Sequence, residues 1–165
     1  MIALDTNVLV RYIVQDDKPQ AKKATQAIEA LTADDPAFIS CIVLCEINWV
    51  LKSAYKISKE DCIGALRSIL SVAVFDVERF DVCSKALTLY EAGAADFSDY
   101  VIQQIARQEG YNTVLSFDKQ AQKLCAVAHK QNPASLKILT RCGFQFIKEA
   151  NYYGHPCQYY EYLAE

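Results

Sequence analysis

The first 127 residues alternate between short apolar runs and longer segments with helical spacing of apolar side chains. Runs typical of short buried strands occupy 2–4, 37–40, 73–77 and 112–117. Segments with helical spacing occupy 6–14, 19–32, 41–55, 58–71, 79–93, 96–110 and 118–127. Ser58-x-x-Asp61 is a capping signal at the start of one of them. The alternation favours an α/β fold with a central, mostly parallel sheet flanked by helices.

The pattern changes after Val127. Residues 132–144 are spaced like a short helix, and 145–151 and 155–165 look like two strands joined through Tyr153-Gly154. We therefore expect one domain over 1–127. The remainder, 128–165, is expected to be a C-terminal appendage of a short helix and a β-hairpin.

Composition limits the class of protein. The chain has 165 residues, of which 52% are hydrophobic and 22% charged, and no run approaches the length of a membrane span. Its start also lacks the layout of a signal peptide, so we expect a cytoplasmic protein without membrane contact. Seven cysteines without a C-x-x-C pair are interpreted as core thiols. The net charge of −3 differs from the basic charge that is typical of a nucleic-acid binder, although a metal ion can supply positive charge locally.

Carboxylates follow two of the predicted strands. Asp5 interrupts an apolar run and Asp118 ends the run VLSF, and in open α/β sheets ligands bind beyond the carboxyl ends of strands. A lone buried carboxylate at Asp5 would need a partner. Helix capping is the alternative for both residues, because Asp is a favoured N-cap and each precedes a helix.

Glu46 lies inside a predicted helix, 41–55, whose residues are nearly all apolar and which we expect to be largely buried. A buried Glu is rare unless it is paired or binds a ligand. A cavity-facing carboxylate is the favoured interpretation. The alternative is an ion pair with a basic residue such as Arg11 or Lys52.

Asp96 and Asp99 stand at the start of a further predicted helix, 96–110. Either Ser98 or Asp96 is expected to cap this helix, which leaves the Asp99 side chain available in the first turn. A favourable interaction with the helix dipole is the alternative for Asp99.

The acids taken together are more informative than any one of them alone. Four acids that converge at one end of a sheet repel one another unless cations or protons neutralise them. Oxygen ligands suit Mg²⁺ or Mn²⁺, and with a phosphate substrate such a site favours phosphodiester hydrolysis. The four predicted ligands and catalytic residues are Asp5, Glu46, Asp99 and Asp118. Sequence motifs of P-loop, dinucleotide-binding, zincin and G-x-S-x-G enzymes are absent.

The motifs LDTNVLVRYI, SCIVLCEINWVL, DFSDYVIQQIA and TVLSFDK resemble, in order and spacing, those of a PIN domain, and most of all a VapC-type toxin ribonuclease. The resemblance covers about 1–127 and implies a PIN-like three-layer fold with metal-binding roles for the four acids. Supporting roles fall on Asn7, Ser116 and, as a less constant acid, Asp96. It also implies an Mg²⁺- or Mn²⁺-dependent endoribonuclease acting on structured RNA, a homodimer, and a cognate antitoxin as partner. Arg11 is a candidate for guiding the RNA backbone.

The segment 128–165 is similar instead to the end of a GNAT-type N-acetyltransferase, without that family's pyrophosphate-binding loop. It is interpreted as a remnant that is dispensable for activity. The alternative to a nuclease is a non-catalytic PIN-fold module that binds RNA or a protein. A phosphatase or a DNA flap nuclease is a more distant alternative.

Overall fold

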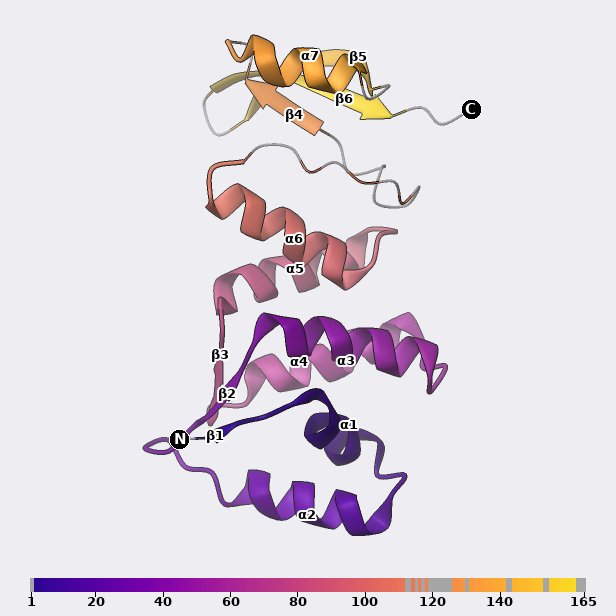
Figure 1. Ribbon diagram of the computed structural model, residues 1–165, viewed down its shortest axis with the longest axis vertical. Helices are drawn as coiled ribbons and strands as arrows, with labels where there is room; N and C mark the ends of the chain where they lie inside the picture. The colour runs from indigo at the N-terminus through magenta and orange to yellow at the C-terminus, as the bar shows by residue number, and fades with distance from the viewer. Residues whose placement is uncertain are drawn as a thin grey trace. The chain divides into compact units, whose positions relative to one another are not determined.

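The computed structural model describes residues 2–111, 114, 116, 118, 126–129, 131–141, 144–152 and 155–162. The chain forms two compact units, Met1–Ala92 and Gly93–Glu165 (Figure 1). No helix in the described ranges is long and apolar enough to span a membrane.

The first unit is built on a three-stranded parallel sheet. Its strands are very short and lie in the order β1 (Ile2–Ala3), β2 (Ala37–Ile39) and β3 (Phe75–Val77). Because parallel strands point the same way, the residues that follow them reach the same edge of the sheet. The residues at this carboxyl edge include Asp5, Ser40 and Glu78.

Five helices accompany this sheet: α1 (Thr6–Val14), α2 (Lys18–Glu29), α3 (Cys41–Ser53), α4 (Lys59–Ser71) and α5 (Phe80–Ala92). Helix α1 packs against α2 and α3, and α4 packs against α3 and α5 (Figure 1). The α/β class and the parallel sheet flanked by helices are therefore confirmed.

Local capping explains where these helices begin. The side chains of Asp17, Ser40 and Ser58 accept hydrogen bonds from the first turns of α2, α3 and α4. At α4 the Asp61 amide donates to the Ser58 hydroxyl over 3.1 Å, as the Ser58-x-x-Asp61 signal predicts.

The core of the first unit is aliphatic, with Leu9, Leu44, Ile47, Leu51 and Leu66 fully buried. Cys62 and Cys83 are buried among these side chains, as expected for core thiols, while Cys41 and Cys45 are half-buried. The prediction that the helix around Glu46 is largely buried is wrong, because Ile42 and Trp49 on α3 are 72% and 66% exposed. One face of α3 is therefore apolar and open.

The second unit contains α6 (Phe97–Gln108), β4 (Ala126–His129), α7 (Pro133–Arg141), β5 (Phe144–Tyr152) and β6 (His155–Tyr162). Its strands form an antiparallel sheet in the order β4-β6-β5, so the predicted hairpin is confirmed. Leu139, Phe144 and Tyr160 make a small core together with Leu136.

Two predicted elements between α6 and β4 lie mostly outside the described residues. Val114 and Ser116, from the predicted strand 112–117, are not in a strand. The predicted helix 118–127 is wrong at its end, because Ala126 and Val127 belong to strand β4 and pair with Tyr160 and Tyr159 of β6. Strand β4 pairs with β6 at the edge of the β5–β6 hairpin, and the local sequence pattern does not reveal this pairing. Strand β4 crosses Val127, and the division into 1–127 and 128–165 stays a prediction.

Candidate functional site

Asp5 stands where β1 gives way to α1. It is the N-cap of α1, and its Oδ1 accepts a hydrogen bond from the Val8 amide over 3.0 Å. The capping alternative is therefore confirmed, and the expectation of a buried carboxylate is wrong, since Asp5 is exposed. Only Oδ1 is used by the cap, and Oδ2 has no partner among the described residues. A capping role and a ligand role are thus compatible at Asp5.

Glu46 of α3 meets the start of α1 through Thr6. Thr6 is 7% exposed, and its hydroxyl donates a hydrogen bond to Glu46 Oε2. Because Thr6 directly follows Asp5, this contact brings the Glu46 carboxylate to the same helix start as Asp5. Thr6 is a residue that the sequence analysis missed, and the contact links positions forty residues apart.

The burial predicted for Glu46 is wrong. Glu46 is exposed, because α3 turns Leu44, Ile47 and Leu51 toward the core and leaves Glu46 on the opposite face. Its alternative, an ion pair with Arg11 or Lys52, is also absent among the described residues. The carboxylate therefore faces open space at the edge of the first unit, with one oxygen held by Thr6.

Glu78 is a second residue that the sequence analysis missed. It follows β3, and its Oε2 accepts a hydrogen bond from the Cys41 amide at the start of α3 over 3.0 Å. An anion at this position stabilises the positive end of the helix dipole. Glu78 therefore fixes the start of α3, the helix that carries Glu46.

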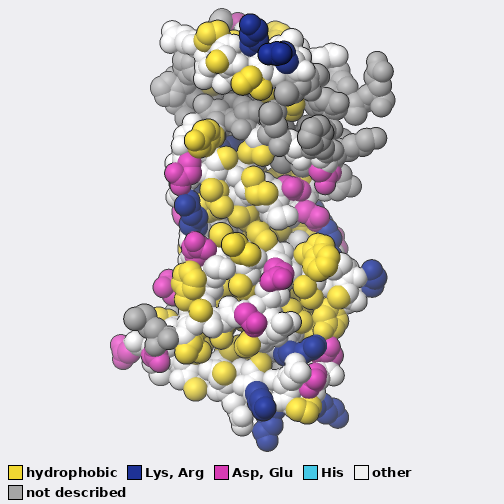
Figure 2. Space-filling view, in the orientation of Figure 1, with side chains coloured by type: hydrophobic (Ala, Val, Ile, Leu, Met, Phe, Trp, Pro, Cys, Tyr) yellow, Lys and Arg dark blue, Asp and Glu magenta, His cyan; other side chains and the backbone are white. Residues whose placement is uncertain are grey.

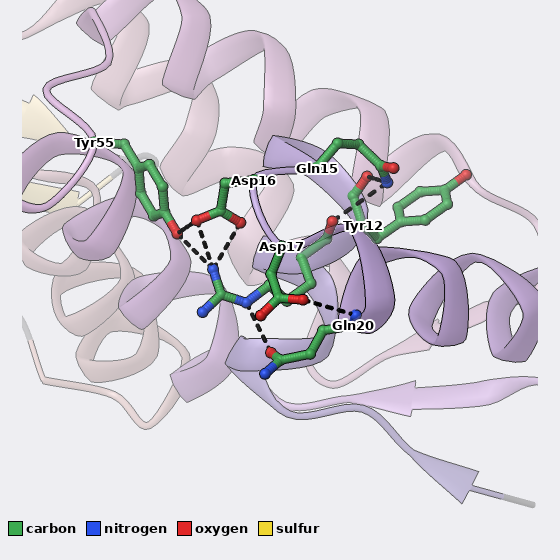
Figure 3. Close-up of polar contacts among 7 residues, drawn as sticks. Tyr12, Gln15, Asp16, Asp17, Gln20 and Tyr55 are labelled. Carbon is green, nitrogen blue, oxygen red and sulfur yellow. Dashed lines mark hydrogen bonds and ion pairs between the residues drawn. The ribbon is translucent and has the colours of Figure 1, made fainter.

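Arg11 forms a closed polar network with Asp16 and Tyr55, the latter two labelled in Figure 3. Its Nη1 lies 2.7 Å from Asp16 Oδ1 and donates to the Tyr55 hydroxyl over 2.9 Å. Tyr55 in turn donates to Asp16 Oδ2 over 2.7 Å. The Tyr55 hydroxyl, followed by Arg11, holds the pKa of Asp16 below its usual value, and the bond to Asp16 raises the pKa of Tyr55. The predicted role of Arg11 in guiding RNA stays a prediction, and its guanidinium already has protein partners.

The second unit carries the other predicted acids. Asp96 is the N-cap of α6, as one of the two predicted alternatives required. Its backbone amide donates to Asp99 Oδ2 over 3.0 Å, which completes a capping box. The prediction that capping leaves the whole Asp99 carboxylate available is therefore wrong for Oδ2.

Asp118 and Ser116 are adjacent in space. The Asp118 amide donates to the Ser116 hydroxyl over 3.1 Å, and the Asp118 side chain is exposed. In the first unit, Asn7 is likewise exposed in the first turn of α1. The predicted roles of Asn7, Ser116 and Asp118 stay predictions.

The donor set of the first unit fits a hard divalent cation. Asp5 and Glu46 offer carboxylate oxygens without described protein partners, and such oxygens suit Mg²⁺ and Mn²⁺. Across the described residues, no three His, Cys, Asp or Glu side chains gather closely enough to hold a metal ion. Asp5 and Glu46 are therefore two candidate ligands and not by themselves a complete site.

Comparison with known proteins places this fold in a class. The PIN domain family matches residues 2–127, and the chain belongs to that family. It is also similar to a VapC ribonuclease of Aquifex aeolicus (strain VF5), with 27% identity over 125 residues. The alignment covers 75% of this chain and 92% of the relative. The family predicted from the four motifs is thus confirmed.

Proposed function

We propose that this chain is a toxin ribonuclease of the VapC type, an Mg²⁺- or Mn²⁺-dependent endonuclease that hydrolyses phosphodiester bonds in structured RNA. The observation that carries the proposal is the Thr6 hydrogen bond to Glu46, which sets two carboxylates at the start of α1 in a PIN domain. The similar protein of Aquifex aeolicus is named a ribonuclease, which supports the same activity here.

Asp5, Glu46, Asp99 and Asp118 are proposed as the metal ligands. Support for the last two comes from the family match, which extends across residues 2–127. When bound, a divalent ion neutralises charge on the phosphate and makes a water molecule more acidic.

The protein's own residues would then have distinct tasks. Asp5 and Asp99 combine ligand and cap, so that each helix start fixes the position of a carboxylate. Thr6 orients Glu46, and Glu78 anchors the helix that carries it. Asn7, Ser116 and Asp96 are proposed as supporting polar groups beside these acids.

The partners are proposed from the same family. A cognate antitoxin would inhibit the enzyme by binding it, and the active form would be a homodimer. Residues 128–165 are proposed to be dispensable for cleavage, so that a chain ending near Val127 remains active.

Cleavage of a mixed pool of transfer and ribosomal RNA tests the activity. Purified protein is assayed with Mg²⁺, with Mn²⁺ and with EDTA, and Asp99→Asn is assayed alongside to exclude a contaminating nuclease. Cutting that requires metal and disappears in the variant supports the proposal. Cutting that survives Asp99→Asn or EDTA contradicts it. Protein that binds RNA but leaves every RNA intact would identify a non-catalytic binding module.

A further inference from the structure

Helix α2 has two chemically different faces. Ala21, Ala24 and Ile28 are buried, consistent with the packing of α2 against α1. Lys18, Lys22 and Lys23 are exposed and, among the described residues, have no ion-pair partner. We call these three residues the α2 lysine face. They place three positive charges in six residues of a chain whose net charge is −3.

This arrangement is unfavourable for the helix by itself. Lys18 and Lys22 are four residues apart, where like charges repel. Lys18 also lies in the first turn, where a positive charge opposes the helix dipole. A solvated helix face needs neither feature, so an anionic partner outside the described chain is the better explanation.

The acids nearest in sequence do not neutralise the lysines. Asp16 is bound by Arg11 and Tyr55, and Asp17 accepts a hydrogen bond from the Gln20 amide as the cap of α2 (Figure 3). Among the described residues, neither carboxylate forms an ion pair with a lysine of α2. Figure 2 shows Lys and Arg side chains gathered at the α2 end of the first unit.

The α2 lysine face and Asp5 belong to the same connection, which joins β1 to β2. Strands β1 and β2 are parallel, so the connection through α1 and α2 must return the chain from the carboxyl edge of the sheet to its amino edge. Asp5 starts this connection, and the three lysines lie in the first half of its second helix, α2. Arg11 Nε donates to Gln20 Oε1 over 2.9 Å, which fastens the first turn of α2 to α1. Helix α1 spans only about 14 Å, so the start of α2, which carries the lysines, follows Asp5 after one short helix.

We propose that the α2 lysine face binds the phosphate backbone of the RNA that this protein cleaves. The inference rests on the proposed function and names the surface that offsets the acidity of the candidate site. Lysine is a flexible point charge, so the contact positions RNA by its phosphates and carries no sequence preference. The guanidinium of Arg11 instead holds α2 in place.

Binding of bulk transfer RNA tests the proposal in EDTA, where cleavage is not expected to interfere. The full chain is compared with the triple variant Lys18→Gln, Lys22→Gln, Lys23→Gln. The matched control is Lys56→Gln, Lys85→Gln, Lys137→Gln, which removes three exposed lysines from other segments and changes the net charge equally. Thermal melting checks that both triples fold.

The α2 triple is expected to bind RNA at least tenfold more weakly at 50 mM salt, a concentration at which phosphate contacts are strong. Its log–log salt dependence should be shallower by about 2 to 3, at roughly 0.7 per lost contact to a single strand and roughly 0.9 to a duplex. The control triple should stay within about threefold of the unchanged chain. Equal weakening of both triples, or wild-type binding by the α2 triple, overturns the proposal.

A cleavage assay separates this inference from the proposed function. With Mn²⁺ present, the α2 triple should show a raised KM and an unchanged kcat at saturating RNA. Metal-dependent cleavage with an unchanged KM rejects the lysine face and leaves the nuclease intact. RNA binding that depends on these lysines, in a chain that never cleaves, keeps the face and rejects the nuclease.

Discussion

The Thr6 hydroxyl donates a hydrogen bond to the Glu46 carboxylate, and this contact joins the start of α1 to the middle of α3. Thr6 is buried and Glu46 is exposed, so a fixed donor holds a carboxylate that otherwise faces solvent. In the proposed metal site Glu46 is a ligand and Thr6 its outer partner, and loss of such a partner typically costs about 10–100-fold in metal affinity or activity.

Thr6→Val keeps the branched shape and removes the hydroxyl, whereas Thr6→Ser keeps the hydroxyl. Thr6→Val is expected to weaken Mn²⁺ binding and RNA cleavage about tenfold or more, with a loss of unfolding free energy of about 1 kcal/mol. Thr6→Ser should stay close to the unchanged protein. Mn²⁺ binding is followed by the emission of Trp49, the sole tryptophan, which lies on α3 three residues from Glu46. Equal metal affinity in the two variants would remove Thr6 from the site.

The helix cap formed by Asp5 and its proposed role as a metal ligand can be separated by mutation. Asn caps helices about as well as Asp, so Asp5→Asn is expected to abolish cleavage while the melting temperature stays equal or rises, because a like charge beside Glu46 is lost. Asp5→Ala should abolish cleavage and also cost about 1 kcal/mol, because the Val8 amide loses its acceptor. Chemical denaturation measures the stability of both variants, and an RNA cleavage assay measures their activity. An active Asp5→Asn, or one as unstable as Asp5→Ala, would make Asp5 a structural residue only.

Through Asp16, the stability of the first unit is expected to depend on pH in the acid range. Its pKa is held low mainly by the Tyr55 hydroxyl and then by Arg11, so its contribution to stability is present above the ordinary Asp value of 3.8 and lost as the pH falls through the lowered pKa. Asp16→Asn should therefore melt below the unchanged protein at pH 7, and the two should converge in acid. Asp17→Asn keeps the cap of α2 and is the matched control. A difference between Asp16→Asn and the unchanged protein that persists at pH 2 would contradict this account.

Through Cys83, the stability of the first unit is expected to fall as the pH rises in the alkaline range. Burial, followed by the nearby Cys41 and Cys45 thiols, raises its pKa from 9.0 to about 12. Between these values the unfolded chain releases the proton and the folded chain keeps it, so the contribution to stability is complete below pH 9 and declines above it. Cys83→Ala should be less stable at pH 8 by about 1–2 kcal/mol, through the cavity it leaves, and the gap should narrow as the pH rises toward 11. Parallel denaturation curves would show that Cys83 does not titrate in this way.

Asn48 faces the core of the first unit, 3% exposed, and its Oδ1 has no hydrogen-bond partner among the described residues. Leu has the same branched shape without the polar atoms. Asn48→Leu is therefore expected to raise the free energy of unfolding by about 1–2 kcal/mol, the cost of a buried unsatisfied group. Urea denaturation measures this change, and a destabilised variant would contradict the expectation.

The fold followed from the sequence because its signals are local. Alternating segments and capping residues such as Ser58 act within a few positions, and the structure confirms both the class and the starts of most helices of the first unit. The course of β4 could not be predicted in this way, because its register depends on pairing with β6 about thirty residues further on.

The site was predictable only in part. Asp5 and Asp96 carry local capping signals, which the structure confirms. The exposure of Glu46 was missed because α3 is apolar on both faces, so hydropathy does not say which face meets the core. Thr6 and Glu78 were missed because their partners come from other elements.

The shortness of the sheet determines how the first unit resists opening. β1 has two residues and β2 and β3 have three each, so the ladder contains few backbone hydrogen bonds. The strands cannot remain closed when the surrounding helices separate, because little else holds them together. Amide hydrogens in β2 should therefore exchange with solvent deuterium at the same free energy of opening as those in α3. The carboxyl edge that presents Asp5 persists only as long as the helical shell around it.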